Sequence, residues 1–146
     1  MEQSKKLTWF NTLKIWIRMK TASINETLQA ATTISKTTQT LIGKEIATGH
    51  YDFITLFFVY TRGDETGLTI IPSFMHSSEG TAYPFAEWSS ASGAKTLTAS
   101  TFTMTATTSG YIRLDVRGIS YVKFTQGGSA NDGTPTGTLA ATYSLQ

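Results

Sequence analysis

Apolar and polar residues alternate with a period of two along most of the chain after residue 50. In YIRLDVRG (111–118) the apolar residues are separated by Arg, Asp and Arg, which indicates a strand with one buried and one solvated face. The same alternation continues in ISYVKFTQ (119–126) and TLAATYSLQ (138–146). The residues predicted to face the core in these segments are Ile112, Leu114, Val116, Val122, Phe124, Leu139, Ala141, Tyr143 and Leu145.

The most apolar of the predicted strands is YDFITLFFVYTR (51–62), in which both alternating faces carry apolar side chains. One face includes Phe57 and Val59, and the other runs from Ile54 to Tyr60. A strand with two apolar faces is predicted to be central in its sheet and covered on both sides.

A hairpin is predicted to follow this strand. GDETG (63–67) has glycine at each end and is typical of a turn, in which Asp64 and Glu65 are expected to be solvated. LTIIPSFMH (68–76) is then the partner strand. Pro72 is expected to mark an edge or a bulge in it, because proline has no N–H to donate to a neighbouring strand.

Further strands are predicted near Gln39–Ile46, at YPFAEW (83–88) and at TLTASTFTMTATT (96–108). About eight strands at hairpin spacing, with no helix expected after residue 50, indicate an all-β fold. We predict a single antiparallel β-sandwich or jelly roll. Residues 23–146 are assigned to this domain, and residues 1–22 to an N-terminal arm.

The composition supports this fold class and limits the chemistry. The 146 residues include 27 threonines and no cysteine, which is typical of a β-rich chain and excludes disulfides, thiolate metal sites and cysteine nucleophiles. The net charge of +2 is unevenly distributed: residues 1–20 hold five Lys/Arg and one acid, whereas the remaining 126 residues hold seven Lys/Arg and nine acids. This slightly acidic body argues against a nucleic-acid surface. No apolar run is long enough to predict a transmembrane helix.

The basic residues of the N-terminal segment are interleaved with aromatic and aliphatic ones in KKLTWFNTLKIWIRMK (5–20). On a helix, five large apolar residues between Trp9 and Ile17 fall within an arc of about 120°. On a strand, apolar residues occupy most of the odd-numbered positions, with Asn11 as an exception. Both conformations therefore remain open for this segment.

Several roles are considered for residues 5–20. Polar residues interrupt the apolar run and no A-x-A site follows, which argues against a secretory signal peptide. An amphipathic helix at a membrane surface and an additional strand on the same domain remain as alternatives. We favour an arm that docks on another chain, because Trp and Arg are common anchors of protein interfaces. The predicted docking residues are Lys5, Lys6, Trp9, Phe10, Leu13, Lys14, Ile15, Trp16, Ile17 and Arg18.

Residues with catalytic or metal-binding chemistry are few and scattered. His50 and His76 lie at predicted strand ends without a partner at metal-ligand spacing, and they are interpreted as surface residues. The glycines form no phosphate-binding fingerprint. We therefore assign no catalytic residue, cofactor or metal, and we do not expect an enzyme.

Two short motifs suggest binding and have structural explanations. Tyr83, Phe85 and Trp88 would form a sugar-stacking platform if their rings were exposed, but packing as a partly buried strand is the favoured interpretation. The tripeptide RGD (62–64) matches the integrin-binding sequence and lies in the predicted turn. A glycine-containing hairpin explains it without any role in adhesion.

Two segments resemble a known class of proteins. YDFITLFFVYTRGDETGLTIIPSF (51–74) is similar to the central hairpin of small β-sandwich structural proteins of tailed bacteriophages, in which a Thr-x-Gly-Asp-Glu-Thr turn joins an aromatic strand to a β-branched one. SGYIRLDVRGISYVKFTQGGSANDGTPTGTLAATYSL (109–145) resembles the C-terminal part of the same class, with a Tyr-Val-Lys/Arg strand, a Gly-Gly loop and a final Thr/Ala-rich strand. The resemblance covers residues 38–146.

The resemblance implies a virion structural protein of the head decoration or cement type, located on the capsid surface after assembly in the host cytoplasm. Its implied partners are the major capsid protein or other virion subunits, and copies of itself in a homo-oligomer for which a trimer is favoured. It implies no catalytic residue. From the residues themselves we predict no cofactor and no nucleic-acid partner, and the docking interpretation of residues 5–20 predicts no membrane partner. The alternative function is a carbohydrate-binding or adhesion β-sandwich module of a phage fibre or tail.

Overall fold

Antiparallel strands account for the regular structure of the protein in a computed structural model, which describes residues 23–36, 39–89, 96–129 and 134–146. These ranges contain no helix, and hence none that is long and apolar enough to cross a membrane. The predicted all-β sandwich is confirmed. The strands are β1 (Ile24–Thr33), β2 (Thr40–Leu41), β3 (Ile46–Ala47), β4 (Phe53–Thr61), β5 (Gly67–Met75), β6 (Tyr83–Pro84), β7 (Ala86–Ser89), β8 (Thr96–Ala99), β9 (Phe102–Met104), β10 (Thr108–Asp115), β11 (Tyr121–Ser129) and β12 (Thr138–Leu145).

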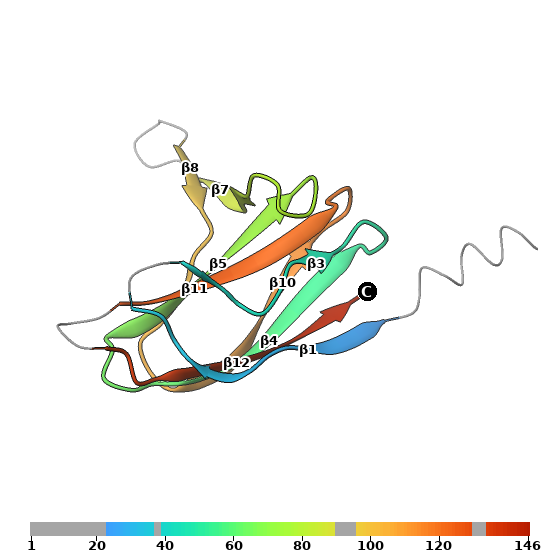
Figure 1. Ribbon diagram of the computed structural model, residues 1–146. Coiled ribbons are helices and arrows are strands. Elements are labelled where there is room, and N and C mark those ends of the chain that lie inside the picture. The colour runs from blue at the N-terminus through green and yellow to red at the C-terminus, as the bar shows by residue number, and fades with distance from the viewer. Residues whose placement is uncertain (1–22, 37–38, 90–95, 130–133) are drawn as a thin grey trace, which may run out of the picture.

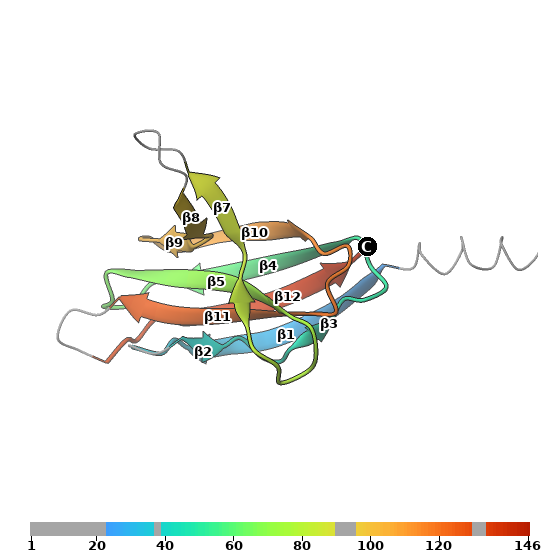
Figure 2. The same ribbon diagram turned by 90° about the horizontal axis from the view of Figure 1, so that it is seen from above.

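The strands form two layers that face each other (Figure 1). The four-stranded sheet has the order β1-β12-β4-β10. The six-stranded sheet has the order β2-β11-β5-β6, with β3 also paired to β11 and β9 to β5. The chain crosses between the layers from β4 to β5 and again along β10, β11 and β12, as in a jelly roll. A two-stranded ribbon of β7 and β8 projects from the sandwich (Figure 2).

The core lies between the two layers and is built from alternate residues of the long strands. Tyr60 of β4, Phe124 of β11 and Leu139 of β12 are fully buried in it. Burial of each such side chain contributes on the order of 1.5–3 kcal/mol, so the period-two pattern supplies much of the stability of the sandwich. The residues predicted to face the core are buried, except for Leu114, which is half-buried against the core.

Strand β4 is central, as predicted, but only one of its faces is covered. Phe57 and Val59 are 46% and 54% exposed, so the prediction of two covered faces is wrong. The neighbouring strand β10 explains why. Its outward residues, Tyr111 and Arg113, pair with Phe57 and Thr55 and are exposed as well, so the part of this side around Phe57, Val59 and Tyr111 faces solvent, whereas Thr55 is buried.

The region before residue 50 differs from its prediction. Residues 24–33 form the ten-residue edge strand β1, although few apolar residues mark it in the sequence. It is held by pairing with β12, with two register shifts along the way. The strand predicted near Gln39–Ile46 is divided into β2 and β3 by Gly43, which has φ +64°. A Cβ atom at Gly43 would lie 2.0 Å from the carbonyl oxygen of Leu28, so the close approach of β1 requires glycine.

Pro72 lies inside β5, which is neither an edge strand nor bulged, so the prediction for it is wrong. The register with β11 is continuous through the pair of Pro72 and Phe124. On its other side, β5 pairs with β9 as far as Ile70 and with β6 from Ser73 onward. The Pro72 carbonyl accepts from the Phe85 N–H on that side, at 3.2 Å. The missing N–H of proline therefore coincides with the gap between two neighbouring strands.

Two other predicted strands are divided in the structure. Residues 96–108 contain β8, β9 and the first residue of β10, and residues 83–88 contain β6 and most of β7. Each break occurs where the chain changes its partner, because β8 pairs with β7, β9 with β5 and β10 with β4. These divisions, together with β1, give twelve strands in the described ranges in place of about eight.

Candidate interaction surfaces

The predicted docking residues, from Lys5 to Arg18, all lie within residues 1–22, outside the residues that the structure describes. The first described strand begins at Ile24, which pairs with Leu145 at the end of β12 (Figure 1). The chain that precedes β1 therefore meets the sandwich at one corner of the four-stranded sheet.

The outer side of the four-stranded sheet carries exposed aromatic and aliphatic side chains. Phe57, Val59 and Tyr111 are 46%, 54% and 68% exposed. Phe57 lies between Tyr111 of β10 and Thr142 of β12, and the rings of Phe57 and Tyr111 are 6.4 Å apart between centroids. A hollow of about 520 Å³ lies over this side. We define the apolar face as Thr27, Ala30, Phe57, Val59, Ser109, Tyr111, Ala140 and Thr142.

Among the described residues that line this hollow, none carries a charge, and its polar groups are hydroxyls and the Gln29 amide. Charged groups begin at one end of the sheet. The Arg113 guanidinium lies 4.5 Å from the centroid of the Phe53 ring. Arg117 forms an ion pair with Asp115, and its hydrogen bonds lower the pKa of the Asp115 carboxyl. An uncharged aromatic centre with charges at its margin is the usual composition of a protein interface.

Sequence reasoning missed the apolar face because it considered the strand at residues 51–62 alone. The useful signal lies in the neighbouring strand, where Ser109, Tyr111 and Arg113 form one outward row of mixed polarity. A row of this composition indicates a strand face in contact with solvent. Because Tyr111 of this row pairs with Phe57, Phe57 is expected to face solvent as well.

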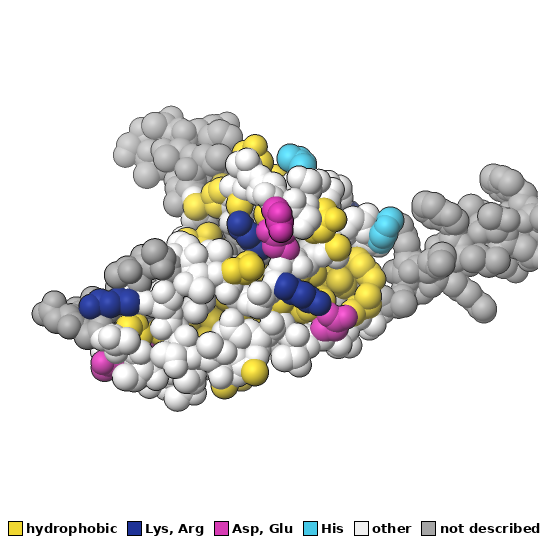
Figure 3. All heavy atoms as spheres, viewed as in Figure 1, with side chains coloured by type: hydrophobic (Ala, Val, Ile, Leu, Met, Phe, Trp, Pro, Cys, Tyr) yellow, Lys and Arg dark blue, Asp and Glu magenta, His cyan; other side chains and the backbone are white. Residues whose placement is uncertain are grey.

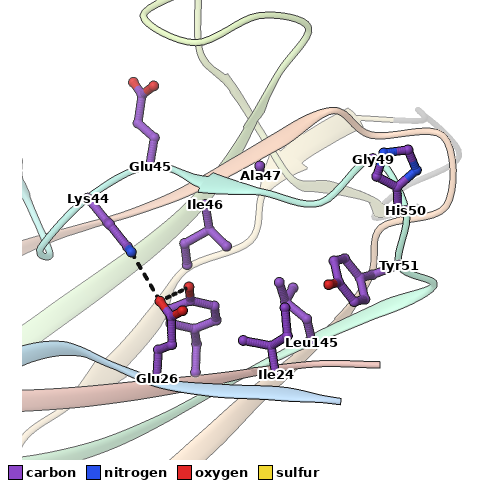
Figure 4. A pocket seen from close by; sticks show the side chains of 11 residues that line it. Ile24, Glu26, Lys44, Glu45, Ile46, Ala47, Gly49, His50, Tyr51 and Leu145 are labelled. Carbon is purple, nitrogen blue, oxygen red and sulfur yellow. Dashed lines mark hydrogen bonds and ion pairs between the residues drawn. The ribbon is translucent and has the colours of Figure 1, made fainter. Parts of the chain in front are cut away.

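A second hollow, of about 380 Å³, lies on the open side of the sandwich between β1 and β3 (Figure 4). Ile24, Ile46 and Leu145 form its apolar floor. Glu26 and Lys44 lie at its rim and form an ion pair with an N–O distance of 3.1 Å. Figure 3 shows hydrophobic side chains gathered in a hollow beside a basic and an acidic side chain.

The rim of the second hollow is held together by Glu26. The Tyr143 hydroxyl donates to Glu26 Oε2 at 2.6 Å, and the Lys44 ammonium donates to the same atom at 3.1 Å. The hydrogen bonds from Tyr143 and Lys44 lower the pKa of Glu26. Burial, followed by the bond to Glu26, raises the pKa of Tyr143 to about 12. This network joins β1 to β12 and to the segment that precedes β3.

The two histidines are surface residues, as predicted. His50 lies at the rim of the second hollow and His76 follows β5, and both are exposed. Within the described ranges, no group of three or more His, Cys, Asp and Glu side chains is placed to share a metal ion.

The predicted aromatic platform is gathered around Phe74 of β5. The Phe74 ring centroid is 5.6 Å from those of both Tyr83 and Phe85, stacked on the first and edge-on to the second. Tyr83 is 46% exposed and has the His76 ring 6.0 Å away. Phe85 is half-buried and packs against the core. The side chain of Trp88 lies outside the described part of the molecule.

The turn between β4 and β5 is stabilised by hydrogen bonds to a buried carboxylate. Asp64 is exposed, but Glu65 is only 1% exposed, so the prediction of a solvated Glu65 is wrong. Glu65 Oε1 accepts from the Tyr60 hydroxyl at 2.6 Å and from the Gly63 N–H at 2.9 Å. Its Oε2 accepts from the Gly137 N–H at 3.1 Å. Burial raises the pKa of Glu65, but the hydrogen bonds from Gly63, Tyr60 and Gly137 outweigh it and bring the pKa to about 2.

Both charged side chains of the RGD tripeptide (62–64) are bound within the sandwich. The Arg62 guanidinium donates to the carbonyl oxygens of Glu65 at 2.9 Å and Thr105 at 2.8 Å. Asp64 Oδ1 accepts from the Thr136 N–H at 3.0 Å. These intramolecular bonds favour the interpretation of the tripeptide as a structural turn.

Comparison with known proteins shows the fold alone. No protein-family model and no curated protein matches the chain. Among solved structures, the SPBc2 prophage-derived protein YomS is similar at a TM-score of 0.52 and 16% identity, over 85% of this chain and 92% of that chain. Tripeptidyl peptidase 2 is similar at 0.50 and 8%, over 84% of this chain and 10% of that chain. The structure of infectious bursal disease virus Gx strain is similar at 0.47 and 11%, over 85% and 32%.

Proposed function

We propose that this chain is a non-enzymatic virion structural protein, of the type that decorates or cements a phage head. It would bind the major capsid protein or other virion subunits through the arm residues Lys5 to Arg18 and the edges of the sandwich. The observation that carries the proposal is the sandwich, which aligns with 92% of a prophage-derived protein while covering 85% of this chain. The resemblance of residues 51–74 and 109–145 to phage structural proteins supports it.

The surfaces of the sandwich suit a protein that works by contact. The edge strand β1 contains two register shifts, which limit uncontrolled pairing with other sheets. The apolar face offers an uncharged area, and the arm supplies cations and tryptophans. On a symmetric lattice, contacts that are individually weak add up to strong attachment because they are made many times.

Co-sedimentation with phage heads that lack decoration tests the proposal. We expect the full chain to pellet with the heads, and removal of residues 1–22 to weaken this binding while the sandwich stays folded. Heads that remain bare at saturating protein would contradict the proposal. Unchanged binding by the shortened chain would contradict the role of the arm.

A matched pair of charge variants tests the arm without shortening the chain. Lys14→Glu with Arg18→Glu reverses two arm charges, whereas Lys36→Glu with Lys123→Glu reverses two charges on the body. We expect only the arm variant to lose head binding and to lose the salt dependence of that binding. Equal losses in the two variants would indicate non-specific electrostatic attraction.

The proposal includes a homo-oligomer, with a trimer favoured. Closed symmetric assemblies are the usual state of soluble oligomers, and a threefold would match a capsid lattice site. Sedimentation equilibrium should therefore give a mass near three times the 15.9 kDa of one chain.

A carbohydrate-binding module of a fibre or tail is the second candidate, because Tyr83 presents a partly exposed ring supported by Phe74. Stacking of a sugar on such a ring is a common mode of recognition by aromatic residues. A glycan array should then show ligands whose binding is lost in Tyr83→Ala and Trp88→Ala. An array without ligands would remove this candidate.

A further inference from the structure

We propose that the apolar face is the surface through which copies of this chain bind one another. The inference rests on the proposed homo-oligomer and adds the surface that forms it. Phe57, Val59 and Tyr111 are the central contact residues.

The exposure of these side chains is not required by the fold. The inward residues of β4 and β10, such as Leu56 and Ile112, form the core whatever the outward residues are. Threonine fits the outward positions equally well, as Thr142 shows beside Phe57. Three adjacent large apolar side chains in contact with water therefore have no structural role in the isolated chain, and such patches mark interaction sites.

The charge pattern identifies a second copy as the occupant. A partner with charged groups at its centre would lose their hydration against a face whose lining, among the described residues, includes no charge to pair with them. The partner must therefore present an uncharged surface, and the apolar face of a second copy is such a surface. Two other exposed large apolar residues, Leu41 and Tyr83, lie apart from it on the six-stranded sheet.

The margin of the apolar face is also suited to self-association. Arg113 is exposed, and its guanidinium is already positioned over the Phe53 ring at 4.5 Å. Asp115 lies on the same outward row, two residues further along β10, and is exposed although it is paired with Arg117. In a closed symmetric assembly such opposite charges remain at the rim, where water can still reach them and where they determine orientation rather than affinity.

Lysine substitutions on exposed residues provide the test. Val59→Lys and Tyr111→Lys should leave the fold intact, because both side chains point to solvent in the isolated chain. We expect each to weaken self-association of the full chain by about 30-fold or more in sedimentation equilibrium, as for central interface residues. Tyr83→Lys is the matched control at an exposed aromatic residue on the other sheet, and it should keep the wild-type mass.

A labelling experiment gives an independent measurement, because the chain contains no cysteine. Val59→Cys should react slowly with maleimide in the oligomer and rapidly after dilution, whereas Tyr83→Cys should react rapidly throughout. Equal rates at both positions would overturn the inference.

Other outcomes also decide the question. A wild-type chain that stays monomeric at all concentrations, or a Tyr111→Lys variant with the wild-type mass, would contradict the inference. Dissociation caused by removal of residues 1–22 but not by Tyr111→Lys would identify the arm as the contact instead. Oligomers that depend on Tyr111 but leave phage heads bare would contradict the proposed function and leave this inference standing.

Discussion

Two glutamates in this protein accept a hydrogen bond from a tyrosine at the same distance but in different surroundings. The oxygen–oxygen distance is 2.6 Å both for Tyr60 with Glu65 and for Tyr143 with Glu26. The Glu65 carboxylate is 1% exposed and also accepts two backbone N–H groups, whereas Glu26 is 47% exposed and also binds Lys44. Identical bond lengths therefore conceal different energetic roles.

Access of water accounts for the difference. If the Glu65 carboxylate is lost, the Tyr60 hydroxyl and the Gly137 N–H remain buried without an acceptor, and water cannot replace the carboxylate there. If the Glu26 carboxylate is lost, solvent can hydrate Lys44 and the rim of the hollow. We therefore expect Glu65 to hold the turn between β4 and β5 permanently, and the Glu26 network to open and close at little cost.

The largest expected effect comes from Glu65→Gln. The amide nitrogen would face N–H donors at Gly63 or Gly137, so we expect a loss of about 2–3 kcal/mol in the free energy of unfolding at pH 7. Urea denaturation measures it. Glu26→Gln is the matched control and should leave the denaturation midpoint unchanged within error. Equal losses in the two variants would show that burial does not distinguish the two pairs.

Acid should reduce the contribution of the Glu65 carboxylate to the free energy of unfolding within a defined range of pH. The pKa of Glu65 is lowered from 4.5 to about 2 on folding, so its stabilisation is complete above pH 4.5 and is lost as the pH falls toward 2. The shift corresponds to about 2–3 kcal/mol after allowance for solvent screening. The stability difference between wild type and Glu65→Gln should therefore shrink between these pH values. A difference that stays constant would contradict the assignment.

Removal of the tyrosine hydroxyls should have a smaller effect. Tyr60→Phe leaves Glu65 with its two backbone donors, so we expect a loss of about 1–2 kcal/mol by urea denaturation. Tyr143→Phe should lose less, because water can reach Glu26. Wild type should also lose the Tyr143 contribution as the pH rises from 10 toward 12, since the pKa of Tyr143 is raised to about 12 in the folded state.

The smallest expected effect is that of Lys44→Gln. Both partners of this ion pair are largely exposed, and the Tyr143 bond to Glu26 remains after the substitution. The urea midpoint should be the same as that of wild type at low and high salt. A loss of stability as large as that of Tyr60→Phe would mean that the Glu26 network stabilises the fold as much as the Glu65 network does.

The strands that could be predicted are those whose own alternation decides their burial. The alternate residues of β12 and Ile112 of β10 face the core as predicted, because a period of two is a local property of the sequence; those of β12 are Leu139, Ala141, Tyr143 and Leu145. Strand β1 was not predicted, since it depends on pairing with β12 at the other end of the chain. The buried state of Glu65 was missed for the same reason, because Gly137, which donates to it, is 72 positions away.

Prediction of the interaction surfaces was limited in a similar way. The exposure of Phe57 follows from its neighbour on β10 and not from its own strand. The docking arm from Lys5 to Arg18 remains a prediction, because it lies outside the residues that the structure describes.

The position of β1 at the edge of the four-stranded sheet has a mechanical consequence for the chain that precedes Ile24. The β1–β12 ladder runs across seven paired positions, from Ile24 with Leu145 to Thr33 with Thr138. Cross-strand hydrogen bonds in an antiparallel pair are perpendicular to the strands. A pull on the chain ahead of Ile24 along β1 therefore loads these bonds together in shear, whereas a pull at a right angle opens them one after another. The chain ahead of Ile24 should therefore resist a force parallel to β1 better than a force perpendicular to it.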